Sequence, residues 1–239
     1  MKLHNLTLIT FSGAHATGKT TLLGDLAEEL SKRPDTAVFQ TESCSSKLFE
    51  RIRSGTVHLP AGAQIPKTYD EINALGLRGF FQEALPNALA FEIEAALLRA
   101  RADHSPKGRT FLLVDRWFAD IFAYTLIESS DATLHERVLG RCRERLSDLF
   151  PYLLGHTRLL RVMNVFVPLK ASNFRVEASD KFRATCDRAL WEQLCRDRWT
   201  DVVGDTRALF VVTRSNRKAR VTQLLSCLES PSPDTTSVT

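Results

Sequence analysis

The run Gly13-Ala14-His15-Ala16-Thr17-Gly18-Lys19-Thr20 places two glycines, a lysine and a hydroxyl in the order G-x-x-x-x-G-K-[ST]. Glycines at the first and sixth positions permit backbone conformations and close approaches that a Cβ would block. Successive backbone N–H groups of such a loop point inward and hold phosphate oxygens, helped by the N-terminus of the next helix. We therefore expect this loop and the adjacent Thr21 to bind a nucleoside triphosphate. Lys19 would reach the β- and γ-phosphates, and Thr20 would bind Mg²⁺.

The surroundings of the loop favour the same interpretation. It follows an apolar run and precedes leucines at helical spacing, which is the context that the motif requires. A glycine-rich turn that matches by chance is the alternative. The guanine-reading pattern [NT]-K-x-D does not occur in the sequence, so ATP is the expected donor. His15 occupies a variable position of the loop and is expected to be solvated rather than catalytic.

A second group of charged residues, Asp115 and Arg116, directly follows the apolar run 111–114. Ligands of open α/β sheets bind beyond the carboxyl ends of the strands, where this pair and the loop would converge. Asp115 is a candidate to hold Mg²⁺ or its water, and Arg116 to hold a transferring or acceptor phosphate. Many hydrolytic ATPases place a glutamate after this aspartate to activate water, so Arg116 favours transfer to an acceptor. A surface ion pair at a strand end is the alternative.

Short apolar runs that alternate with longer helical patterns would position these residues. The runs are nearly continuous, as expected for strands of a parallel sheet that is covered on both faces. Leucines at 22, 23, 26 and 30 keep helical spacing, as does the series 182, 186, 190 and 194. The pattern predicts an α/β fold with a doubly wound, parallel five-stranded sheet and a P-loop. The expected strands are Leu6–Phe11, Thr36–Thr41, Thr110–Val114, Val162–Val167 and Arg207–Val212.

Prolines and glycines mark the expected interruptions. The stretch Arg53–Lys67 contains two of each and predicts a loop. Pro86 is expected to divide a helical region into Asp70–Ala84 and Asn87–Asp103, because proline removes a backbone donor. The end of the chain, 230–239, has no apolar periodicity and is expected to be disordered. Residues 1–229 would form the kinase domain.

Composition narrows the class of protein. The chain has 239 residues, enough for one domain with a sizeable core, and its 44% hydrophobic and 25% charged residues are ordinary for a globular protein. The net charge of +4 suits polyanionic ligands but does not by itself indicate nucleic acid. Five cysteines without a CxxC pair disfavour a disulfide framework or a zinc site. No apolar stretch is long enough to span a bilayer, and no signal peptide is evident, so we expect a cytoplasmic protein.

Several segments resemble known phosphotransferases. The run FEIEAALLRARADHSPKGRTFLLVDRWFADIFAY is similar to the acceptor-side helix, strand and Asp-Arg-aromatic motif of thymidylate kinases and deoxynucleoside kinases. FVPLKASNFRVEASDKFRATCDRALWEQL and LFVVTRSNRKARVTQLLSCL are more similar to the P-loop group that includes the ribosylnicotinamide kinase domain. Thr41-Glu42-Ser43-Cys44 departs from the Arg-Glu-Pro-Gly-Gly run of thymidylate kinases, which argues against thymidine monophosphate as the acceptor.

The resemblance implies further site residues. In such kinases a carboxylate at the end of the second strand often lies near the acceptor hydroxyl, and Glu42 matches that place. It would serve as a general base or orient the acceptor; a solvated loop residue is the alternative. The resemblance also implies a lid over about 169–184, in which Arg175 and Arg183 would neutralise the phosphoryl group in flight. A solvated basic helix start, capped by Asp180, is the alternative there.

A helical region that reads the acceptor base in related kinases contains Gln82, Phe91 and Arg99. For Phe91 a place in the core is the favoured alternative. These assignments leave the identity of the acceptor open.

The expected function is an ATP- and Mg²⁺-dependent kinase for a small nucleoside- or nucleotide-like acceptor, with a homodimer as one possible assembly. The first alternative is a kinase that acts on nucleic acid. Its basic groove would use two clusters: Arg99, Arg101, Lys107 and Arg109, and Arg214, Arg217, Lys218 and Arg220. The second alternative is an NTP-binding switch or ATPase without an acceptor.

Overall fold

The structure is a computed structural model that describes residues 2–14, 17–103, 108–168, 184–190, 192, 207–213 and 216–229. The predicted lid, with Arg175 and Arg183, lies outside the described residues except for residue 184. His15, Ala16, Asp180 and the segment 230–239 also lie outside them.

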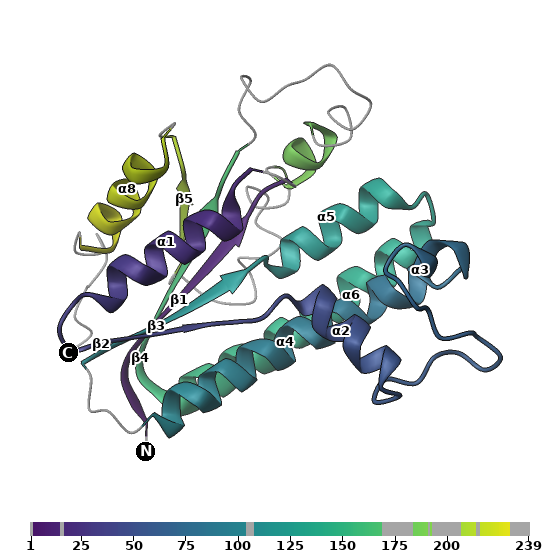
Figure 1. Ribbon diagram of the computed structural model, residues 1–239, viewed down its shortest axis with the longest axis horizontal. Helices are drawn as coiled ribbons and strands as arrows, with labels where there is room; N and C mark the ends of the chain where they lie inside the picture. The colour runs from purple at the N-terminus through teal and green to yellow at the C-terminus, as the bar shows by residue number, and fades with distance from the viewer. Residues whose placement is uncertain are drawn as a thin grey trace.

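A parallel sheet forms the centre of the molecule (Figure 1). Its strands are β1 (Leu3–Ser12), β2 (Thr36–Gln40), β3 (Arg109–Asp115), β4 (Thr157–Phe166) and β5 (Arg207–Val211), in the order β2-β3-β1-β4-β5. Every adjacent pair runs parallel. The predicted α/β class with a parallel sheet is therefore confirmed. β4 begins five residues before the expected start at residue 162, because its first half, with exposed Arg158 and Leu159, is not a continuous apolar run.

Alternation along each strand supplies two separate apolar layers. On β1, Leu6 and Leu8 belong to one buried cluster, and Ile9 and Phe11 to another. β3 and β4 divide their side chains between the same two clusters. Since neighbouring side chains of a strand point to opposite faces, both faces of the sheet require a cover of helices.

The helices supply that cover (Figure 1). α1 (Lys19–Ser31) and α8 (Arg217–Glu229) pack on one face through their buried leucines and Val221. α4 (Arg78–Ala102) and α6 (Ala132–His156) pack on the other face and contact each other. Among the described residues no helix is both long and apolar enough to cross a membrane.

Helix α4 corrects one prediction. It continues through Pro86, which was expected to divide the region into two helices. A proline inside a helix costs about 3 kcal/mol through the missing donor and ring clash. Here the residue and the turns after it are buried against the sheet and α6, including Leu89, Ile93 and Leu97. Burial of three such side chains contributes several times ~1.5 kcal/mol and offsets that cost.

Shorter helices surround the carboxyl ends of β2 and β3. α2 (Cys44–Arg53) follows β2, α3 (Glu71–Ala74) follows a loop, and α5 (Phe118–Glu128) directly follows β3. Residues 184–190 are helical, as the apolar spacing predicted, and Cys186 and Leu190 are buried there. Cys186 packs in a small cluster with Ala14 and Tyr124, which connects this helix to the end of β1 and to α5.

Candidate phosphoryl-transfer site

The glycine-rich loop (Gly13–Thr20) joins β1 to α1 and uses both of its glycines. Gly13 has φ +150°, and a Cβ built there would lie 2.4 Å from the carbonyl oxygen of Val167. Gly18 has φ +87° at the N-cap of α1, a left-handed conformation that side chains disfavour. Both glycines are thus required by the backbone path, as the motif predicts.

Two side chains of the loop bond to its own backbone. Lys19 Nζ donates to the carbonyl oxygen of Ala14 at 2.6 Å, and Thr17 Oγ1 donates to the same oxygen at 3.0 Å. Lys19 is only 6% exposed. Burial lowers the pKa of Lys19, and the negative charges of Asp120 and Asp115 partly oppose that shift. The ammonium group is therefore held inside the loop and close to two carboxylates.

The first turn of α1 is open to an anion. It contains no acidic side chain, and both Thr20 and Thr21 are exposed. Free N–H groups and the helix dipole give such a terminus a partial positive charge. The loop and this terminus together favour a phosphate group.

The end of β3 lies beside the loop. The register of the sheet pairs Asp115 with Phe11, two residues before Gly13. Asp115 Oδ2 accepts a hydrogen bond of 3.2 Å from Thr20 Oγ1. Asp115 Oδ1 is buried and has no hydrogen-bond partner among the described residues. The structure thus brings together the two residues that the sequence proposed as metal ligands.

Arg116 leaves the strand in a left-handed conformation, with φ +81°. Non-glycine residues adopt this conformation at a cost of order 1–3 kcal/mol and concentrate at functional sites. Its N–H donates to the carbonyl oxygen of Phe11 at 3.0 Å, and its guanidinium lies 5.1 Å from the centre of the Tyr124 ring. The turn therefore aims Arg116 away from the sheet and toward α5.

A cavity of about 300 Å³, here called the α2–α4–α5 cavity, opens beside this turn. It is lined by the N-terminus of α2, by Tyr69 and α3, by the first two turns of α4, by Arg116 and by α5. Arg78 forms an ion pair with Glu128, and Gln82 Nε2 donates to Glu128 Oε2 at 2.9 Å. Gln82 is 4% exposed, and its Oε1 atom has no described partner. The cavity thus has a mixed lining that contains a buried acceptor without a described partner.

The candidate residues implied by resemblance fall in different places. Gln82 lines the cavity, whereas Phe91 and Arg99 do not. Phe91 is 51% exposed under the guanidinium of Arg51, so it does not lie in the core. Arg99 Nη2 donates to the carbonyl oxygen of Gln40 at the end of β2. Glu42 is exposed, pairs with Lys47 at 2.8 Å and is absent from the cavity lining.

Asp120 is a site-proximal residue that the sequence reasoning missed. It is fully buried in the first turn of α5 and contacts Ser12, Gly13 and Trp117. An acidic residue in an otherwise apolar run, three residues after a helix N-cap, was the available signal.

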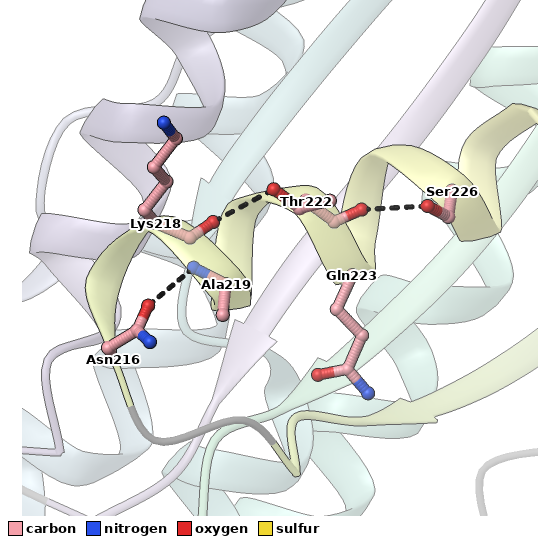
Figure 2. A pocket seen from close by; sticks show the side chains of 6 residues that line it. All are labelled: Asn216, Lys218, Ala219, Thr222, Gln223 and Ser226. Atoms are coloured by element: carbon pink, nitrogen blue, oxygen red, sulfur yellow. Dashed lines mark hydrogen bonds between the residues drawn. The ribbon is translucent and has the colours of Figure 1, made fainter.

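A larger hollow of about 600 Å³ is lined by Asn216 and by residues of α8 (Figure 2). Figure 2 shows that two of its hydroxyl side chains bond within their own helix: Thr222 and Ser226 donate to carbonyl groups one turn earlier. Asn216 caps the helix by accepting from the N–H of Ala219. Its described lining therefore has no convergent set of polar groups.

The basic clusters weighed for nucleic acid are partly engaged within the protein. Arg217 forms an ion pair with Asp25 of α1, and Arg220 Nη1 donates to the carbonyl oxygen of Thr17 at 3.0 Å. Lys107 and Arg214 lie outside the described residues. These contacts attach α8 to α1 and to the glycine-rich loop.

Comparisons with solved structures find thymidylate kinases. The enzyme from Candida albicans matches with a TM-score of 0.49 and 15% identity, over 96% of this chain and 92% of that one. The enzyme from Ehrlichia chaffeensis matches with a TM-score of 0.48 and 14% identity, over 94% and 99%. No protein-family model matches the chain. No curated protein matches it in sequence.

Proposed function

We propose that this protein is an ATP- and Mg²⁺-dependent kinase that transfers the γ-phosphoryl group to a small nucleoside- or nucleotide-like acceptor. One observation carries the proposal. Lys19, Thr20 and Asp115 gather where β1 and β3 end, and Arg116 leads from this cluster to a cavity of small-molecule size. Donor and acceptor groups can then meet at one edge of the sheet, where ligands of open α/β sheets bind.

The donor side is built mainly from backbone. The loop and the first turn of α1 would present N–H groups to the β-phosphate. Lys19 would exchange the carbonyl oxygen of Ala14 for phosphate oxygens, since an ammonium group forms stronger hydrogen bonds with an anion. Because the group is already buried, little solvent has to be reorganised as charge develops on the transferring phosphoryl group.

Thr20 and Asp115 suit Mg²⁺, which prefers oxygen ligands and commonly takes one or two carboxylates together with substrate phosphates and water. The Thr20 hydroxyl and an Asp115 carboxylate oxygen are already adjacent, and the second carboxylate oxygen lacks a partner. The described residues hold no cluster of three or more His, Cys, Asp or Glu side chains that would form an all-protein metal site. Held by Thr20 and Asp115, the metal would neutralise negative charge on the phosphates.

The acceptor would occupy the α2–α4–α5 cavity. A volume of about 300 Å³ lies at the lower end of the range for small-molecule sites. Gln82 Oε1 requires a donor, and an amide or ring N–H group of a nucleobase-like ligand would supply it. Arg116, between the cavity and the loop, would contact the group that receives the phosphoryl. Arg175 and Arg183, which lie outside the described residues, are the further candidates to compensate the charge of the phosphoryl group.

Incubation with γ-labelled ATP and Mg²⁺ tests the proposal. Panels of nucleosides, nucleoside monophosphates, ribosylnicotinamide and a single-stranded oligonucleotide would be compared, with Lys19→Ala as the inactive control. Label on a nucleoside or nucleotide is the expected result. Label only on the oligonucleotide would show that the acceptor is nucleic acid. Label only in free phosphate would show that the protein is an ATPase and not a kinase.

A further inference from the structure

Asp120 contacts two separate strand ends through one buried carboxylate. Oδ2 accepts from the hydroxyl of Ser12, the last residue of β1, at 2.5 Å. Oδ1 accepts from the N–H of Gly13, the first residue of the glycine-rich loop, at 3.4 Å. Oδ2 also accepts from the N–H of Trp117, the residue that follows Asp115 and Arg116, at 2.9 Å. The carboxylate therefore joins the start of the loop to the turn after β3.

Helix capping explains only one of these contacts. Asp120 occupies the N3 position of α5, and its bond to the N–H of Trp117 is the ordinary contact of a capping box. The bonds to Ser12 and Gly13 reach residues more than a hundred positions away and contribute nothing to the cap. An exposed carboxylate would cap the helix equally well, whereas this one is completely buried.

Burial of a carboxyl group is costly unless hydrogen bonds and opposite charges compensate. Burial raises the pKa of Asp120, while the bond from Ser12 and the positive charges of Lys19 and Arg116 oppose that rise. Lys19 belongs to the side of the site proposed for the phosphoryl donor, and Arg116 to the side proposed for the phosphoryl acceptor. The residue thus lies between the two halves that must be aligned for transfer.

We propose that Asp120 is a positioning residue that holds the glycine-rich loop in register with the Asp115–Arg116 turn. The inference rests on the proposed function, because alignment of these two elements matters only if a phosphoryl group passes between them. Both carboxylate oxygens accept hydrogen bonds, so an amide cannot replace the group. With one oxygen directed at Ser12 and Trp117, the amide nitrogen of asparagine would face the N–H of Gly13, donor against donor.

The test compares two variants that change hydrogen bonds of the Asp120 carboxylate with one control variant on α5. Asp120→Asn retains size and the helix cap but disrupts the bond to Gly13. Ser12→Ala removes the hydrogen bond between the end of β1 and Asp120 and leaves the helix cap intact. Thr125→Val is the matched control, because Thr125 is fully buried on α5 and its hydroxyl bonds, among the described residues, to the carbonyl oxygen of Ile121 in the same helix. Unfolding temperature, Mg·ADP affinity by calorimetry, and kcat and KM for transfer from ATP would be measured for each.

We expect Asp120→Asn and Ser12→Ala each to weaken Mg·ADP binding by about tenfold and to lower kcat further, as loss of a buried hydrogen bond to a charged group would. Thr125→Val should keep both the Mg·ADP affinity and kcat within about twofold of the wild-type values. The double variant should lose less than the product of the single effects, because both changes act on hydrogen bonds of the same carboxylate. The proposal would be overturned if Asp120→Asn and Ser12→Ala bound Mg·ADP with wild-type affinity. It would also be overturned if their losses merely matched their fall in unfolding temperature, as expected of a structural change such as Thr125→Val.

Hydrogen exchange of the Gly13 amide separates this proposal from the proposed function. If the wild-type protein binds no Mg·ADP, the proposed function fails, but the exchange rate in the free protein still tests the contact. We expect Ser12→Ala to accelerate exchange at Gly13 at least about tenfold relative to Thr125→Val. Equal rates would overturn the positioning role, even if Asp120→Asn does not fold.

Discussion

The glycine-rich loop and the α2–α4–α5 cavity border the same turn at Arg116, but they are held in different ways. In the loop, Lys19 and Thr17 are bonded to the loop backbone, and Asp120 and Arg220 hold its two ends. In the cavity, buried polar atoms of Arg78 and Gln82 lack hydrogen-bond partners among the described residues. The loop is thus held by contacts within the protein and would, under the proposed function, be preorganised for a phosphate, whereas the cavity would depend on a ligand to complete its hydrogen bonds. Variants in the loop should therefore change the use of ATP, and variants in the cavity should change the use of the acceptor.

The largest effect is expected for Lys19→Ala. Loss of a buried ammonium group aimed at the phosphates should lower phosphoryl transfer by at least ~10²-fold with the fold intact. Lys32→Ala is the control, since Lys32 is exposed at the end of α1 and pairs with Glu28 and Glu29. Transfer of label and thermal unfolding would be measured together. Near-normal turnover of Lys19→Ala would contradict both the proposed kinase and the contrast between the regions.

Asp115→Asn should act on the metal requirement. Asparagine keeps the bond to Thr20 but removes the negative charge, so the Mg²⁺ concentration for half-maximal rate should rise about 10–100-fold. Asp148→Asn, on the exposed surface of α6, should leave that concentration unchanged. A titration of rate against Mg²⁺ measures the difference. An unchanged requirement would remove Asp115 from the metal site.

Gln82→Leu tests the cavity side alone. Removal of the buried amide should raise the KM of the acceptor about tenfold, because the ligand would lose a buried hydrogen-bond partner. The KM of ATP should not change. Gln223→Leu, on α8, is the control for loss of a glutamine elsewhere. If KM for ATP rose instead, the cavity would belong to the nucleotide rather than to the acceptor.

The smallest effect is expected for Glu42→Gln. Glu42 is exposed and paired with Lys47 outside the cavity lining, and exposed ion pairs contribute about 0–1 kcal/mol. Transfer should fall by less than about threefold on nucleosides and on monophosphates alike. A drop of ~10²-fold or more on nucleosides only would show that Glu42 enters the cavity and takes the acceptor proton.

Strand positions and the loop could be predicted because they depend on local features. β3 was expected at 110–114 and spans Arg109–Asp115, since a strand covered on both faces leaves a continuous apolar run. Pro86 shows the limit of local reasoning. Its intrinsic cost predicts a break, and only the packing of α4 against α6 and the sheet decides otherwise.

The sequence by itself indicated the glycine-rich loop from Gly13 to Thr20, because glycines at its first and sixth positions permit the backbone path that such a loop requires. It also placed Asp115 and Arg116 at a strand end. Only the tertiary structure decided which other side chains reach the site. Asp120 bonds to residues 107 and 108 positions away, and Gln82 bonds to Glu128 46 positions away. Glu42, adjacent in sequence to a strand end, points to Lys47 instead. Contacts between distant segments follow from how helices pack on the sheet, and no local pattern of residue types encodes them.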